Sequence, residues 1–323
     1  MRARLTILLP ALCLMLAPGM SAQAQGYPVK PVRLVIPYPS GGGADILGRI
    51  VAQKLGDAWG QQVLADNRGG ANGIIGTEIV AHAPPDGYTL LFPSSPHTVN
   101  LSMVAKLPFD TVKDFAPIAL VGTTPYILVV HPSMPVRSVR ELIAFAKARP
   151  GQIDYASGGA GGSPHLAMEL FKSMTGIRLE HVPYKGVGPA LVDVVGGQVQ
   201  VFFSNSAPAM PHIKSGRLRA LGTSGAKRAA VAPDIPTVAE AGVPGFEASA
   251  WFGLLAPART PRAVVDRINA EVNKFMRTRE VQERIHALGA EVLLSTPEEY
   301  AQIIDADIRR WGKLVRDLGL RAD

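Results

Sequence analysis

The stretch Pro37-Tyr38-Pro39-Ser40-Gly41-Gly42-Gly43-Ala44-Asp45 decides the fold of this 323-residue chain. Branched apolar residues over 32–37 precede it and predict a strand, while apolar residues at helical spacing over 44–59 follow it and predict a helix. Glycines at such a junction let backbone N–H groups approach a ligand, and the helix N-terminus adds about half a positive charge, so the loop suits an anion. A tight turn without a ligand would need the same glycines, so this loop alone leaves both interpretations open.

Known phosphate-binding and dinucleotide-binding loops do not match this stretch. No Gly-Lys-Ser or Gly-Lys-Thr follows the glycines, which excludes a P-loop, and their contiguity excludes a Rossmann fingerprint. Asp45 either caps the helix or orients the loop, and we expect it to cap the helix.

A second loop of the same kind lies between a strand expected over 153–157 and a helix expected over 164–175. It consists of Ser157, Gly158, Gly159, Ala160, Gly161, Gly162 and Ser163. Two strand–glycine–helix loops that face each other across a cleft would hold one or two carboxylates between them. His165, in the first turn of the second helix, either contacts the ligand or packs against the loop.

The rest of the chain alternates strands and helices, which predicts an α/β fold built mostly on parallel sheets. Strands are expected over 116–121 and 126–131. The apolar extended runs 118–123 and 126–130 are separated only by Thr124-Pro125, and a further extended segment follows at 247–256. We interpret them as two crossings between lobes. Lobe 1 is then formed by residues 25–124 and 251–323, and lobe 2 by residues 125–250. Further strands are expected over 62–66, 89–93, 179–182, 199–204 and 218–223, and helices over 74–83, 139–148, 261–276, 279–288 and 297–318.

Further candidate ligand contacts follow two of these strands, because open α/β sheets bind ligands at the carboxyl ends of their strands. They are Ser94, Ser95, His97 and Asn100 after the strand over 89–93, and Ser204, Asn205 and Ser206 after the strand near 199–203. Turn chemistry alone also places hydroxyl and amide groups in loops. Tyr184 either forms a wall of the cleft or braces its lobe.

The first 24 residues are typical of a secretory signal peptide. Arg2 and Arg4 precede an apolar run over 5–17, and the small-residue site Ala22-Gln23-Ala24 predicts cleavage after Ala24. The only cysteine, Cys13, falls inside this segment, so we expect a mature protein without disulfides or thiolate sites. A disulfide-free secreted chain fits the bacterial periplasm.

Composition and motifs argue against several functions. The hydrophobic fraction of 47% excludes a disordered chain, and the basic residues behind the formal charge of +7 are dispersed, which is not typical of a nucleic-acid-binding surface. We find no Gly-x-Ser-x-Gly or His-Glu-x-x-His motif and no metal-ligand spacing among the histidines. We therefore expect no catalytic residues, no metal and no cofactor. The histidines are His82, His97, His131, His165, His181, His212 and His286.

Taken together, the segments of this chain resemble the Bug family, the extracytoplasmic solute receptors of tripartite tricarboxylate transporters. Besides the first glycine loop, the matching segments are Tyr27-Pro28, 66–73, 85–90, 114–118, 181–186, Pro236-Thr237, 240–242, Trp251 and Ala256-Pro257. The resemblance implies a type II periplasmic-binding-protein fold with two α/β lobes, a ligand cleft and two crossover segments. It also implies a small carboxylate held by Tyr38, Ser40, Gly41, Gly42, Gly43, Asp45 and the loop from Ser157 to Ser163. The sequence departs from the common pattern at Ser40, where proline is frequent, and at Gly162, where serine is frequent.

We therefore expect a monomeric periplasmic solute-binding protein that delivers an organic carboxylate to a membrane permease. A receptor that signals to a membrane sensor kinase, and a secreted enzyme on the same fold, remain the alternatives. No arginine lies in either glycine loop, so helix termini and amides would hold the anion without the burial cost of a paired side-chain charge.

Overall fold

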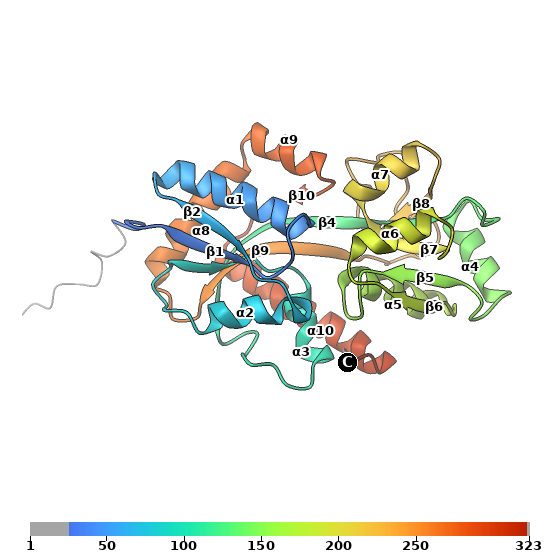
Figure 1. The fold of residues 1–323 in the computed structure, drawn as a ribbon, viewed down its shortest axis with the longest axis horizontal. Helices are drawn as coiled ribbons and strands as arrows, with labels where there is room; N and C mark the ends of the chain where they lie inside the picture. The colour runs from blue at the N-terminus through green and yellow to red at the C-terminus, as the bar shows by residue number, and fades with distance from the viewer. Residues whose placement is uncertain (1–25, 322–323) are drawn as a thin grey trace, which may run out of the picture.

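Two α/β lobes joined by two long strands make up the computed structural model, which describes residues 26–321 (Figure 1). The connecting strands are β4 (Phe115–Val130) and β9 (Ser249–Pro257), which pair antiparallel. The strand order β2-β1-β3-β9-β4-β7-β5-β6 runs from one lobe to the other, with β8 and β10 also paired to β4. The predicted signal peptide lies outside the described residues.

In lobe 1, three parallel strands lie beside β9, with helices on both sides of the sheet (Figure 1). The strands are β1 (Val32–Ile36), β2 (Val63–Asn67) and β3 (Thr89–Leu91), together with the short β10 (Glu291–Val292). The helices are α1 (Gly43–Trp59), the 3-10 turn Ala71–Gly73, α2 (Ile74–Ala81), α3 (Pro96–Met103), α8 (Arg262–Met276), α9 (Arg279–Ala287) and α10 (Pro297–Leu318).

Lobe 2 repeats this arrangement on a smaller scale. Its strands are β5 (Asp154–Ser157), β6 (Glu180–Pro183), β7 (Val201–Asn205) and β8 (Arg219–Thr223). Its helices are α4 (Val139–Lys147), α5 (Ser163–Thr175), α6 (Val187–Val195) and α7 (Ser206–Lys214). Strands β6, β5 and β7 are parallel, so the loops that precede α5, α6 and α7 all lie at their carboxyl ends.

The prediction of two separate strands over 116–121 and 126–131 is wrong, because β4 is one continuous strand from Phe115 to Val130. It pairs with β9 as far as Pro125, opposite Ser249, and with β7 from Tyr126, opposite Asn205. Pro125 lies at the point where β4 stops pairing with β9 and begins to pair with β7. Proline suits an extended backbone, and at this position its missing N–H interrupts neither ladder of hydrogen bonds. The connection between the lobes therefore remains hydrogen-bonded.

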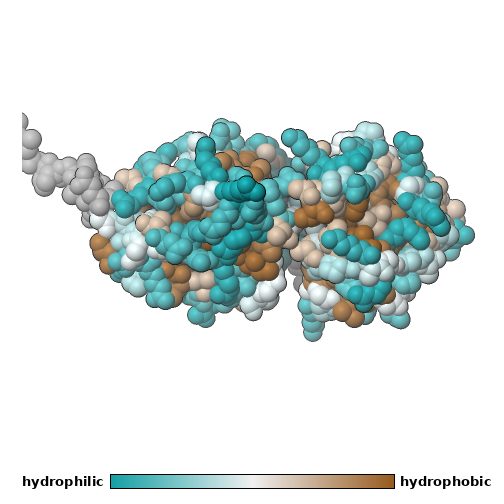
Figure 2. Space-filling view, turned by 90° about the horizontal axis from the view of Figure 1, so that it is seen from above, coloured by the Kyte–Doolittle hydropathy of each residue, from teal (hydrophilic) through white to brown (hydrophobic). Residues whose placement is uncertain are grey.

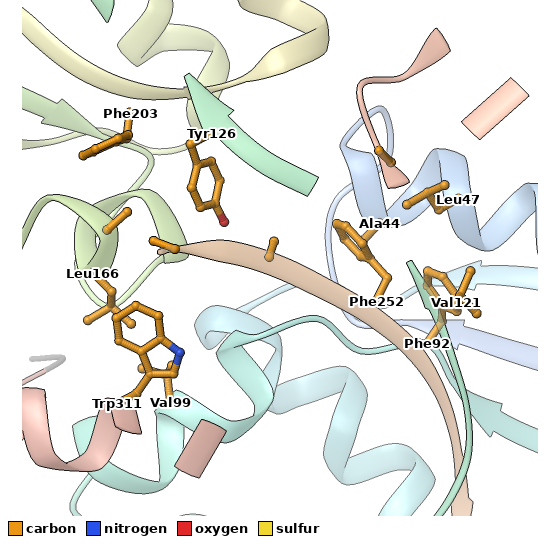
Figure 3. Close-up of a cluster of buried hydrophobic side chains, with 14 of the residues drawn as sticks. Ala44, Leu47, Phe92, Val99, Val121, Tyr126, Leu166, Phe203, Phe252 and Trp311 are labelled. Carbon is orange, nitrogen blue, oxygen red and sulfur yellow. The ribbon is translucent and has the colours of Figure 1, made fainter. Parts of the chain in front are cut away.

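Apolar side chains form a core cluster that is continuous from one lobe to the other (Figure 3). In lobe 1, Ala44 and Leu47 of α1 lie beside Phe252 of β9 and Phe92. At the junction, Tyr126 of β4 and Leu166 of α5 lie in the same cluster as Val99 of α3 and Trp311 of α10. Packing between the lobes therefore adds to the two strands that connect them.

Within residues 26–321, no helix combines the length and the apolar character that a membrane span requires.

Candidate ligand-binding cleft

A cavity of about 630 Å³ opens between the lobes, and the groove between the two halves is visible in Figure 2. Lobe 1 contributes the first glycine loop, the start of α1 and the turn between α9 and β10, while lobe 2 contributes the starts of α6 and α7. The lining consists of Tyr38, Pro39, Ser40, Gly41, Gly42, Gly43, Ile46, Leu47, Thr124, Gly186, Val187, Gly188, Asn205, Ala207, Pro208, Leu288 and Ala290. None of these lining residues carries a charged side chain.

Three helices begin at this cavity. Gly42 is the N-cap of α1, Gly186 the N-cap of α6 and Asn205 the N-cap of α7, and all three residues line the cavity. The first N–H groups of a helix have no acceptor within the helix, and the helix dipole places partial positive charge there. The arrangement supplies a positive potential to the cavity without any Lys or Arg in the lining.

Asp45 holds the first glycine loop in place. Its carboxylate accepts hydrogen bonds from the Gly41 N–H (2.9 Å) and from Arg49 Nε (2.8 Å). Arg49 also donates to Asn67, and Asn67 donates to the Tyr38 carbonyl (3.1 Å). Burial alone would raise the pKa of Asp45, but these hydrogen bonds and the Arg49 charge outweigh it and lower that pKa.

The expectation that Asp45 caps α1 is therefore corrected. The N-cap is Gly42 and has no side-chain cap, whereas Asp45 reaches back beyond it to the loop. Gly41 has a φ of 85°, a left-handed conformation that favours glycine, so the loop needs this bracing to stay in one geometry.

Tyr38 ties the first loop to the end of β3. Its hydroxyl oxygen accepts from the Ser94 N–H at 3.1 Å, and its ring lies against Gly73. Burial raises the pKa of the Tyr38 hydroxyl well above its ordinary value, so the phenol stays neutral. The ring thus presents a fixed, uncharged wall to the cavity.

The second glycine loop lies behind the cavity wall and does not line it. A Cβ built on Gly158 would lie 3.1 Å from Val187 Cγ2, and Gly186 donates its N–H to the Gly158 carbonyl at 3.0 Å. At its other end, a Cβ on Gly161 would lie 3.2 Å from Met103 Cε, across the lobe junction. The loop therefore supports the α6 end of the cavity and contacts lobe 1.

Two histidines fix the conformation of this second loop. His165 Nδ1 accepts the Gly161 N–H at 3.1 Å, and Ser157 Oγ lies 2.6 Å from His181 Nε2. The two imidazoles are stacked with centroids 4.2 Å apart. Burial, and then the neighbouring His181, lower the pKa of His165 to about 4, so at neutral pH the ring is uncharged and can accept this bond. His165 thus packs against the loop, the second of its two expected roles.

The structure sorts the predicted site residues into two groups. Tyr38, Ser40, Gly41, Gly42, Gly43 and Asn205 line the cavity. A second group of predicted residues lies outside the lining, and direct ligand contact by these residues stays a prediction. They are Asp45, Ser94, Ser204, His165 and residues 157–163. His97 also lies outside it, with its buried ring 5.1 Å from that of Phe115 and 6.3 Å from that of Phe109, which is a packing environment.

Four further candidates make structural hydrogen bonds instead of lining the cavity. Ser95 Oγ accepts the Trp251 N–H at 3.0 Å, and the Ser206 hydroxyl donates to the Pro125 carbonyl at 3.0 Å. Asn100 pairs with Asn72 at 2.9 Å. Tyr184 donates to Asp193 at 2.7 Å and so braces its lobe.

The sequence analysis did not predict the cavity-lining residues that lie in α6, in α7 and in the turn after α9. Gly186-Val187-Gly188 forms a third strand–glycine–helix junction, and this spacing was visible in the sequence. Helix α6 (Val187–Val195), which follows this junction, was not predicted because the segment is rich in β-branched valine, which favours strands. Nothing local in the sequence marks Leu288 and Ala290, which reach the cavity only through tertiary packing.

Among residues 26–321, no group of three or more His, Cys, Asp or Glu side chains is arranged to hold a metal ion.

Two α/β lobes, two connecting strands and a cavity between the lobes define a fold of the periplasmic-binding-protein class. Residues 47–320 match the family described as the tripartite tricarboxylate transporter family receptor, and the chain belongs to this family. Protein BugT of Bordetella pertussis is 39% identical over 300 residues, which is 92% of each chain.

Solved structures of similar proteins agree with this assignment. A protein of R. palustris solved with adipate is 35% identical, with a TM-score of 0.84 over 91% of this chain and 99% of its own. MatC from Rhodopseudomonas palustris, solved with bound malate, is 32% identical, with a TM-score of 0.79 over 90% of this chain and 100% of its own.

Proposed function

We propose that this chain is a periplasmic receptor that captures a small organic carboxylate between its lobes and delivers it to a tripartite tricarboxylate-type permease. The observation that carries the proposal is the convergence of the starts of α1, α6 and α7 on one cavity whose lining has no charged side chain. Such a site attracts an anion and releases it easily, because no buried side-chain charge is left unpaired when the ligand leaves.

In this proposal lobe 1 (25–124 and 251–323) and lobe 2 (125–250) close on the ligand together. Micromolar affinity requires about 8 kcal/mol. A hydrogen bond to a charged group contributes roughly 1.5–3 kcal/mol before the cost of association is subtracted. Several donors are therefore needed, and α1 offers them from lobe 1 while α6 and α7 offer them from lobe 2. The second glycine loop and His165 hold the lobe 2 side in position.

The similarity to proteins solved with adipate and with malate supports a carboxylate as the ligand class. The predicted signal peptide supports the periplasmic location. We propose a monomer that acts by binding rather than by catalysis, with a membrane permease as its partner. A sensor kinase is the other candidate partner.

A ligand screen tests this proposal directly. Mature protein, refolded to remove carried ligand, is titrated with mono-, di- and tricarboxylates and amino acids while the melting temperature is recorded. At 1 mM, a ligand of micromolar affinity should stabilise the protein by about 4 kcal/mol. Folded, ligand-free protein that no carboxylate stabilises would contradict the proposal.

A charge introduced at Gly41 locates the anion. Gly41 is exposed, lines the cavity and has no atom within 4 Å of a built Cβ, so a small side chain fits there. Asp and Asn adopt a positive φ more often than other L residues, so the two variants carry a similar backbone strain. Gly41→Asp should lower affinity at least 100-fold by like-charge repulsion, whereas the neutral control Gly41→Asn should lower it less than ten-fold. Calorimetric titration of both variants measures the difference, and equal losses would place the anion elsewhere.

A further inference from the structure

The lining of the cavity combines a few polar groups with a larger set of apolar side chains. The polar groups are those of the first glycine loop, Thr124 and Asn205, together with the N–H groups at the starts of α6 and α7. Ile46 lies one helical turn, about 5.4 Å, further along α1 than Gly42, and its side chain is 38% exposed although it is a large apolar residue. Ile46 therefore adds an apolar side chain to the lining one turn beyond the start of α1.

Apolar side chains from both lobes continue this wall. Val187 begins α6, Pro208 lies in the first turn of α7, and Leu288 and Ala290 flank the turn between α9 and β10. This turn contacts lobe 2 directly, because a Cβ built on Gly289 would lie 2.6 Å from Ser206 Cβ. The turn thus closes one side of the cavity with hydrocarbon groups.

The size and chemistry of this apolar part restrict the body of the ligand. A cavity of about 630 Å³ lies within the roughly 300–1,000 Å³ typical of sites that enclose drug-sized ligands. A hydrocarbon body gains free energy when it is buried against such a wall. A hydroxyl placed there loses its water partners and meets Ile46, Val187 and Leu288, which cannot hydrogen-bond through their side chains.

We infer that the ligand is a carboxylate whose body is an unhydroxylated hydrocarbon chain or ring, selected by Ile46 and Leu288. This inference rests on the proposed function, since it names the class of carboxylate that the same cavity receives. A hydroxy acid of equal length and charge is the disfavoured alternative.

Matched pairs of acids test the inference separately from the proposed function. Adipate is compared with galactarate, its tetrahydroxy counterpart, and cyclohexanecarboxylate with its hydroxylated counterpart quinate; succinate and tartrate form a short pair. In each pair that binds, the unhydroxylated acid should bind at least ten-fold more tightly by calorimetry. Equal or tighter binding of the hydroxylated member in a pair that binds would overturn the inference. If none of the six acids binds, the carboxylate found in the ligand screen decides: a hydroxylated body overturns the inference, whereas binding of no carboxylate at all contradicts the proposed function instead.

Variants of the apolar wall provide the second arm of the test. Ile46→Ser and Leu288→Ser should each weaken the unhydroxylated acid about ten-fold and change the affinity of its hydroxylated partner less than two-fold. Val192→Ser is the control, because Val192 is 68% exposed on α6 and does not line the cavity. Since Leu288 also packs against the core, Ile46→Ser keeps the test valid if Leu288→Ser folds poorly. Equal loss for both members of a pair in Ile46→Ser contradicts a selective role for this residue.

Discussion

Gly289 shows how one residue determines whether the two lobes can meet. Its φ is 72°, a conformation that L side chains rarely adopt, and the turn it forms lies directly against Ser206 at the start of α7. A methyl group at this position would force the turn away from lobe 2. The absence of a side chain thus permits the contact between Leu288–Ala290 and the opposite lobe.

Gly289→Ala should therefore weaken ligand binding by roughly ten-fold, equivalent to about 1.4 kcal/mol. The control is Gly319→Ala, because Gly319 has a similar φ of 63° but no atom within 4 Å of a built Cβ. Both variants carry the same backbone strain, so a difference in affinity reports the clash with lobe 2. Calorimetric titration with the ligand found in the screen measures it, and equal affinities would show that this contact does not affect binding.

At the scale of elements, Asp307 joins α10 to α3 and β9. Its carboxylate accepts from the Thr98 hydroxyl, from Trp251 Nε1 (2.9 Å) and from Trp311 Nε1 (2.8 Å). Burial raises the pKa of Asp307, although these donors act in the opposite direction. The C-terminal helix is thus fixed to the strand that connects the lobes.

Asp307→Asn should destabilise the protein by about 1–3 kcal/mol, because the amide has one acceptor oxygen where the carboxylate uses both. At least one donor would then lose its partner and face the amide NH₂ instead. Asp305→Asn, on an exposed position of the same helix, serves as the control. Urea unfolding at pH 7 compares the two variants, and equal stability would show that the Asp307 hydrogen bonds do not stabilise the fold.

At the scale of the whole molecule, each lobe buries a histidine that resists protonation. Burial lowers the pKa of His97 in lobe 1 to about 4, and burial and the neighbouring His181 lower the pKa of His165 in lobe 2 to about 4. The unfolded chain binds these protons near pH 6.5. As the pH falls from 6.5 to 4, the unfolded state therefore takes up protons that the folded state does not, and stability decreases.

Each of these histidines should lower the free energy of unfolding by about 2 kcal/mol between pH 7 and pH 5. His97→Leu removes one titrating group, so the difference between the two pH values should shrink by that amount. His286→Leu, on an exposed position of α9, is the control. Urea unfolding at both pH values isolates the proton effect from the change in packing. An unchanged pH dependence in His97→Leu would contradict the burial argument.

The sequence by itself determined the order of the elements and the place of the glycine loops. The helix predicted over 44–59 is Gly43–Trp59, and the helix predicted over 297–318 is Pro297–Leu318. These predictions succeed because helical spacing, caps and glycine junctions depend on residues within a few positions of each other. The short helices α3, α6 and α7 were missed because a terminal proline, β-branched valines and an internal proline hide their periodicity.

Only the tertiary structure decided which residues meet at the cavity. It placed Gly41 and Leu288, 247 positions apart, on the same lining, and it set the second glycine loop behind the wall rather than on it. It also assigned Asp45 to the loop and His97 to the core. The physical reason is that a local pattern fixes the conformation of a segment, whereas contacts between distant segments follow from how β4 and β9 position the two lobes.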